Sequence, residues 1–121
     1  MPRWAMRRPG KFGNRHVEID GLRFDSAAEG RRYEQLRMLE RAGEIQDLRV
    51  HPRYVIIDAL RVGSRREKAI VYEADFAYTE MGRQIVEDVK GVETAVFRLK
   101  RRLFLQRYPE LEFRVLDARE I

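Results

Sequence analysis

The alternation of apolar and polar positions is most distinctive in residues 69–91. Two apolar runs flank a short polar stretch, 79–83, that contains a glycine, and this arrangement predicts a β-hairpin. If Met81 and Gly82 are the two central turn residues, the register follows by counting outward along both strands. A change of one residue in the turn would shift every cross-strand neighbour.

The predicted register gathers charged residues on one sheet face. Counting outward from the turn places Asp75 directly across from Asp88, and opposed residues share a face. Lys90 lies two residues after Asp88, so it shares that face as well. We call these three residues the carboxylate–lysine patch. Aspartate is depleted in strands, and such breaks of a local rule tend to fall at functional sites. Glu87 would point to the opposite face and Glu73 would lie further from the turn, so both are open to a purely structural role.

A helix is predicted from Ser26 to about Ala42. Ser26 can cap its first turn, and Glu29 three residues later completes a capping box. Tyr33 and Leu36 follow Glu29 at helical intervals, which places Glu29 on or near the stripe that faces the core. Glu29 therefore either only caps the helix or directs its carboxylate from the first turn toward the carboxylate–lysine patch.

A second helix is predicted from Ala95 to about Arg107, capped by Glu93 or Thr94 and ended by Pro109. One apolar stripe is expected to face the core. Its members are Val96, Phe97, Leu99, Leu103, Phe104 and Tyr108. Basic residues fill the remainder of the helix with no acid among them, which is typical of a solvated face or of one that faces phosphate groups.

The remaining pattern completes an α/β domain. A small hairpin is predicted at 16–24, a strand at 53–59, a charged loop at 61–68 and a last strand at 112–116. The order is then helix, three strands, helix, strand. This order predicts a mixed central sheet flanked by helices, in which the final strand–helix–strand crossover is parallel.

Composition narrows the function classes. At 121 residues the chain suits one domain, expected at 16–121 after an N-terminal arm. Absence of cysteine excludes disulfides and thiolate metal sites, and two histidines cannot build a histidine-rich site alone. His51 is expected at the surface rather than as a ligand. Without an apolar run of about 20 residues or a signal peptide, a cytoplasmic location with no membrane partner is expected.

The net charge of +5 is concentrated in residues 1–15. That stretch holds Arg3, Arg7, Arg8, Lys11 and Arg15 and no acid. The rest of the chain balances 20 basic against 20 acidic residues. A basic arm on a neutral domain indicates a polyanionic partner, and the alternative is a solvated tail. Lys100 and Arg101 on the second helix are further candidate DNA contacts.

The residue types of the carboxylate–lysine patch suggest a divalent-metal site. Two carboxylates a few ångströms apart repel each other unless one takes up a proton or a cation lies between them. Oxygen ligands suit Mg²⁺ or Mn²⁺, held so that positions stay open for water and phosphate oxygens. Lys90 can hold a water nucleophile and stabilise a pentavalent phosphorane, or serve as the base. A cross-strand salt bridge of Lys90 with Asp75 is the structural alternative.

These residues carry a family resemblance. Asp75, the run Asp88-Val89-Lys90 and the preceding Glu29 resemble the signature of the PD-(D/E)XK nucleases, with alanine in place of the proline of the name. The resemblance implies a restriction-endonuclease-like core and Mg²⁺-dependent hydrolysis of DNA phosphodiesters, with Mn²⁺ as a substitute.

The resemblance also implies residue roles. Asp75 and Asp88 would bind the metal together with the Val89 carbonyl. Glu29 would bind a second metal or a bridging water, and Lys90 would be the catalytic lysine.

Within that superfamily the chain resembles small phage-encoded endonucleases, through KFGNR, FDSAAEGRRY, ADFAY and VEDVKG, and more loosely the archaeal type of Holliday junction resolvase. This implies a homodimer that makes paired symmetric nicks in four-way DNA junctions, with no small-molecule substrate, in the host cytoplasm if phage-encoded. Two alternatives stay open: another branched-DNA or DNA-end nuclease of phage replication or packaging, and a non-catalytic DNA-binding subunit. So small a chain leaves little room for a sequence-reading domain, which favours recognition of DNA shape.

Overall fold

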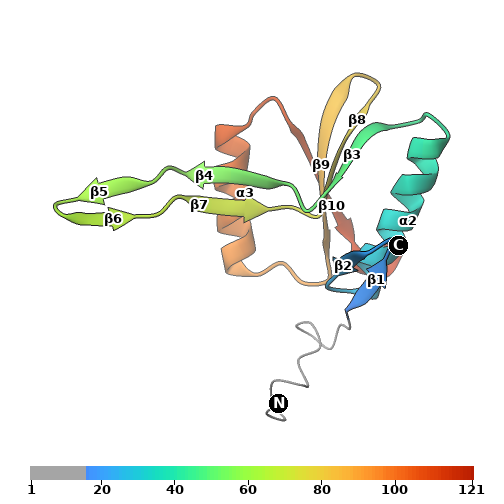
Figure 1. The fold of residues 1–121 in the computed structure, drawn as a ribbon, viewed down its shortest axis with the longest axis horizontal. Helices are drawn as coiled ribbons and strands as arrows, with labels where there is room; N and C mark the ends of the chain where they lie inside the picture. Colours follow the sequence, from blue (N-terminus) through green and yellow to red (C-terminus); the bar gives the residue numbers. More distant parts are fainter. Residues whose placement is uncertain (1–15) are drawn as a thin grey trace, which may run out of the picture.

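The computed structural model describes residues 16–121 (Figure 1). The predicted basic arm lies outside the described residues, and with it the candidate DNA contacts Arg7, Arg8, Lys11 and Arg15. The described chain is a mixed α/β structure in which two α-helices pack on opposite faces of a mixed sheet. Neither of these two helices is long and apolar enough to cross a membrane.

The central sheet has the strand order β10-β9-β8-β3. Its strands are β3 (Gln46–Val50), β8 (Phe76–Glu80), β9 (Arg83–Lys90) and β10 (Glu112–Asp117). The helices are α2 (Ala27–Arg41) and α3 (Ala95–Arg107). The pair β9–β10 is parallel, as expected, and the other two pairs are antiparallel. Following the chain, the elements of this layer run helix, three strands, helix, strand.

The β8–β9 turn confirms the predicted register. Met81 and Gly82 both have positive φ, at 50° and 77°, which is the signature of a type I′ turn. Glu80 accordingly pairs with Arg83, and the pairing continues to Phe76 opposite Glu87. Continued by one residue, this register places Asp75 opposite Asp88.

The prediction of one long hairpin over 69–91 is wrong in its first strand. The chain bends at Asp75, so that β7 (Ile70–Glu73) leaves the sheet and pairs with β4 (Arg53–Ile57). The strand predicted at 53–59 therefore lies outside the central sheet. The third strand of the sheet is β3, which was not predicted. A register shift and the positive φ of Asp47 interrupt its pairing, so its sequence has no regular alternation.

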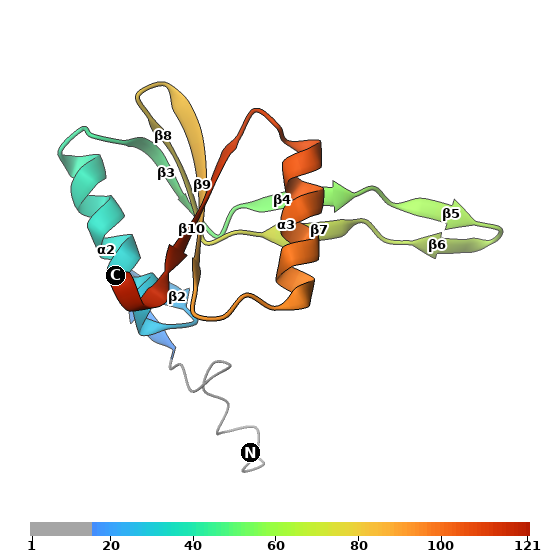
Figure 2. The ribbon, with the colours of Figure 1, turned by 180° about the vertical axis from the view of Figure 1, so that it is seen from behind.

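The charged stretch 61–68 forms a hairpin where a loop was predicted. Its strands are β5 (Leu60–Val62) and β6 (Arg65–Glu67). All six strand residues are exposed, so no apolar face marks them in the sequence. Figures 1 and 2 show β4, β5, β6 and β7 as one long ribbon that extends away from the sheet.

Helix α2 covers one face of the sheet. Ser26 caps it, because its Oγ accepts a hydrogen bond from the Glu29 backbone N–H at 3.2 Å. The hairpin of β1 (Val17–Ile19) and β2 (Leu22–Phe24) confirms the prediction at 16–24 and lies directly on the helix. A Cβ at Gly30 would stand 2.8 Å from Val17 Cγ2, so this close approach requires glycine.

Helix α3 covers the other face and crosses the base of the ribbon (Figure 2). Phe97 and Phe104 are buried against the sheet and the ribbon. Tyr108 donates a hydrogen bond to the Val55 carbonyl at 2.8 Å. The predicted apolar stripe was too wide, because Val96 and Leu99 are 61% and 60% exposed. The ring cluster around Phe104 turns the helix so that those two residues face outward.

Glu87 is a structural ion-pair partner on the α2 face. It is fully buried, and the Arg32 Nε and Nη2 atoms donate to its two carboxylate oxygens at 2.8 and 2.7 Å. The Tyr78 hydroxyl also donates to it. A buried carboxylate is stable only when paired and hydrogen-bonded in this way.

Arg32→Ala is therefore expected to lower the free energy of unfolding by about 3 kcal/mol, since it leaves Glu87 buried without its counter-charge. Urea denaturation measures the effect. Arg41→Ala, which removes an exposed charge from the same helix, is the control and should change stability by less than about 0.5 kcal/mol. Equal stability of the two variants would contradict the role given to this ion pair.

Candidate metal centre

Two aspartates are locked to each other's strands. Asp75 lies at the bend before β8, and Asp88 lies inside β9. The Asp75 backbone N–H donates to Asp88 Oδ1 at 2.9 Å, and the Val89 N–H donates to Asp75 Oδ2 at 2.8 Å. These reciprocal bonds hold both carboxylates in place and account for the bend at Asp75.

Each carboxylate keeps one oxygen out of this arrangement. Asp88 Oδ2 is buried and has no hydrogen-bond partner among the described residues. Asp75 Oδ1 accepts no hydrogen bond from residues 16–121. A buried carboxylate oxygen without a donor is costly, and a bound cation is one way to satisfy it.

Lys90 lies beside the orphaned oxygen. Its Nζ is 3.9 Å from Asp88 Oδ2 and 4.4 Å from the centre of the Phe97 ring. The structure thus brings Lys90 into the carboxylate–lysine patch as predicted, but its ion pair is with Asp88 and not with Asp75. The contact with α3 places this patch on the α3 face of the sheet.

Glu29 is close enough to the patch for the charges of Asp75 and Lys90 to shift its pKa. Burial, then the charges of Asp75 and Asp25, raise the pKa of Glu29 to about 8, while the charge of Lys90 lowers it. Its backbone N–H donates to Ser26 Oγ, which confirms the capping role. A role for its half-buried carboxylate in the metal centre stays a prediction.

The pKa of each of these three carboxyl groups is raised above its ordinary value. Burial raises the pKa of Asp88 to about 6, against the opposing effects of Lys90 and the Asp75 amide. Burial also raises the pKa of Asp75, against its hydrogen bond from Val89 and the charge of Lys90. A cation among these groups would favour their charged forms and remove the penalty.

The donor set fits a hard divalent cation with few protein ligands. Within residues 16–121, no three acidic or histidine side chains converge closely enough to form a complete metal site. The remaining candidate ligands are Asp75 and Asp88. Val89 follows Asp88 in the sequence, and its N–H already donates to Asp75. Mg²⁺ is commonly held by one or two carboxylates and retains several waters, so two aspartate oxygens suffice.

Two residues near the site, His51 and Asp25, were not predicted from the sequence. His51 was expected at the surface, but it is half-buried, its N–H donates to the Asp75 carbonyl at 2.9 Å, and its charge lowers the pKa of Asp75. Asp25 raises the pKa of both Glu29 and Asp75 and pairs with His16 at 3.3 Å. The only sequence signals were the position of Asp25 next to the helix cap and that of His51 before a proline.

Of the predicted DNA contacts on α3, Arg101 lies next to the patch. Arg101 pairs with Glu93 at 3.3 Å and its guanidinium lies 5.1 Å from the Phe97 ring centre, on the same ring that Lys90 contacts. Lys100 is half-exposed on the same helix. Contact of these residues with DNA stays a prediction.

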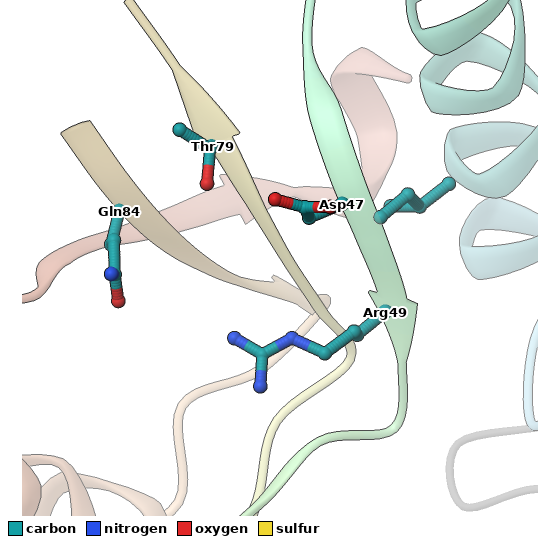
Figure 3. A pocket seen from close by; sticks show the side chains of 5 residues that line it. Asp47, Arg49, Thr79 and Gln84 are labelled. Carbon is teal, nitrogen blue, oxygen red and sulfur yellow. The ribbon is translucent and has the colours of Figure 1, made fainter. Parts of the chain in front are cut away.

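A polar pocket of about 480 Å³ lies apart from the patch. Figure 3 shows Asp47, Arg49, Thr79 and Gln84 extending into it from β3, β8 and β9. No predicted site residue lines it. A smaller hollow of about 260 Å³ adjoins Lys90, and its other lining residues are Gly91, Glu93, Val115 and Asp117.

These observations define a mixed α/β domain with a paired-carboxylate and lysine site on one face of its sheet. The chain belongs to a family described as "Protein of unknown function (DUF1064)", whose model matches residues 9–119. No curated protein and no solved structure matches the chain.

Proposed function

We propose that this protein is a metal-dependent, structure-selective DNA endonuclease, and specifically a Holliday junction resolvase that makes paired symmetric nicks in four-way junctions. The observation that carries the proposal is the orphaned, buried Asp88 Oδ2, with Asp75 bonded across the strands and the Lys90 amine 3.9 Å away. Carboxylates of this kind beside an amine suit hydrolysis of a phosphodiester.

The layer order supports the proposal. The elements of the central layer run helix, three strands, helix, strand, with the ribbon inserted between β3 and β8. A restriction-endonuclease-like core has this order, with its acids on the second and third strands. Asp88 lies on the third of these strands, β9, and Asp75 directly precedes the second, β8.

Asp75, Asp88 and the Val89 carbonyl would hold Mg²⁺, with Mn²⁺ as a substitute. The bound ion would neutralise charge that develops on the scissile phosphodiester. Glu29 would bind a second ion or a bridging water, and its raised pKa means that it holds a proton near pH 7 until a cation replaces it.

Lys90 would orient the attacking water and stabilise the negative charge of the transition state. Asp88 and Phe97 fix its amine from two sides, which limits the motion of a flexible side chain. Arginine supplies 21 of the 25 basic residues, so a lysine at this place is a distinctive choice. Arginine does not give up a proton, and its wide fork would fit poorly in so small a space.

A two-fold homodimer would place two such sites on one junction. Paired nicks at symmetric positions require two active centres related by a two-fold axis. Val96 and Leu99 are exposed apolar residues of α3 and are candidates for contact between copies. Sedimentation of the protein with and without a junction measures the assembly.

The proposal predicts metal-dependent, junction-selective cleavage. A labelled four-way junction, a fork, a duplex and a single strand are each incubated with Mg²⁺, with Mn²⁺ and with chelator. Paired symmetric nicks are expected in the junction alone, and only with metal. Equal cutting of all four substrates would remove junction selectivity, and junction binding without cutting in either metal would identify a non-catalytic DNA-binding subunit instead.

A further inference from the structure

The outer part of the ribbon, formed by β5 and β6, packs against nothing in the described chain. All six of its strand residues are exposed, including Leu60 and Val62 at 49% and 56%. A two-stranded hairpin without a packed face is marginally stable by itself. An exposed projection of this kind is available for contact with a molecule outside the chain.

Its charge is strongly positive and poorly balanced. Residues 60–68 hold four basic residues and one acid. Arg65 pairs with that acid, Glu67, at 2.8 Å. Arg61 lies directly opposite Arg66, and like charges in that position destabilise a ribbon. Neither of those two arginines has a carboxylate within ion-pairing distance among residues 16–121. An anion across both guanidiniums would turn this repulsion into a binding site.

The base of the ribbon is also the edge of the candidate metal centre. Strand β7 ends at Glu73, two residues before Asp75, and the Ala74 N–H donates to the Pro52 carbonyl at 3.0 Å. Asp75 lies 12 residues after Gly63 in the turn, which is about 40 Å along a fully extended strand at roughly 3.3 Å per residue. One turn of a DNA duplex spans about 34 Å, so the ribbon has the reach of one helical turn.

We propose that the outer ribbon binds a duplex arm of the DNA substrate, with Arg61 and Arg66 on the sugar–phosphate backbone. The inference rests on the proposed function for the choice of DNA as the polyanion. A two-stranded ribbon fits the major groove, which is about 12 Å wide, and arginines at its rim then meet phosphates. These contacts position the duplex without reading its sequence, as shape-selective cleavage requires.

The first test is the salt dependence of binding. The double variant Arg61→Ala, Arg66→Ala is compared with a matched control, Arg23→Ala, Arg41→Ala, which removes two exposed arginines from the α2 side of the sheet. Junction affinity is measured at several salt concentrations with chelator present, so that no strand is cut. The slope of log K against log salt should be shallower by about two for the ribbon variant. The control should keep the wild-type slope.

The second test maps contact at the tip. The chain has no cysteine, so Ser64→Cys introduces a unique thiol beside Gly63 in the ribbon turn. Met81→Cys, at the exposed tip of the β8–β9 hairpin, is the matched control. With a photocrosslinker on the thiol, the first protein should attach to a duplex arm and the second should not.

The outcomes separate the two proposals. A wild-type protein that binds but never cuts, with the ribbon effects as expected, overturns the nuclease function and leaves the ribbon contact standing. An unchanged salt slope and no crosslink in a protein that cuts junctions overturns the ribbon contact alone. A ribbon variant that loses dimerisation while its salt slope stays at the wild-type value identifies a second copy of the chain as the occupant and also overturns it. Circular dichroism confirms that each variant is folded.

Discussion

Replacing Lys90 by alanine is expected to abolish junction cleavage, with a loss in rate of about 10³-fold, while junction binding stays near wild type. Loss of a single group that stabilises transition-state charge typically has an effect of this size. Binding persists because it rests on many phosphate contacts spread over the surface. Single-turnover cleavage and junction affinity, measured on the same protein, separate the two effects.

Two further variants define what Lys90 contributes. Lys90→Arg keeps the charge but should still fail to cut, because arginine does not release a proton and its wide fork crowds Asp88 and Phe97. Arg41→Ala removes an exposed charge at the end of α2 remote from Glu29, and should leave the cleavage rate almost unchanged. Cleavage by Lys90→Ala at the wild-type rate would remove Lys90 from the mechanism.

The parts of the fold that depend on residues close in the chain were predicted from the sequence. The Met81-Gly82 turn, the cap at Ser26 and the stop before Pro109 each depend on residues close in the chain, and their elements fall where predicted. The facing positions of Asp75 and Asp88 followed from the first of these, because a tight turn fixes the register on both sides.

Tertiary packing decided what the sequence did not reveal. Strand β3 has a half-polar sequence and a register shift, and it is a strand because β8 offers a partner. The outer ribbon lacks an apolar alternation, since no face of it packs against the core. His51 reaches the site through a bend with positive φ. None of these features depends on a local pattern, so periodicity alone could not identify them.

The site shows the same division. Asp88 and Lys90 share a face because they lie two apart on a strand, which is a local rule. The orphaned oxygen of Asp88, in contrast, depends on which donors the rest of the fold brings near it. The sequence therefore predicted the participants of the patch, and only the structure identifies the atom that lacks a partner.

Asp88→Asn is expected to abolish cleavage and, in the absence of metal, to stabilise the protein above pH 6. Burial raises the pKa of Asp88 from 3.8 to about 6 in the folded protein. The folded state then binds a proton more tightly than the unfolded state, so the free energy of unfolding falls as pH rises from about 4 to about 6. The carboxylate lowers stability by about 3 kcal/mol above that range, and asparagine does not ionise.

Denaturation with urea at pH 5 and pH 8, with and without Mg²⁺, measures this prediction apart from any cleavage. In the wild type, Mg²⁺ should stabilise the fold more at pH 8, by about 3 kcal/mol at a hundredfold excess over its dissociation constant. At pH 5 the ion must displace protons, so it should stabilise the wild type less. Mg²⁺ should stabilise Asp88→Asn only slightly at either pH, because that variant lacks one of the two carboxylates. Asp47→Asn, which changes an exposed aspartate outside the patch, should respond to Mg²⁺ like the wild type. Equal Mg²⁺ stabilisation of Asp88→Asn and the wild type would place the metal elsewhere and remove the basis of the nuclease proposal.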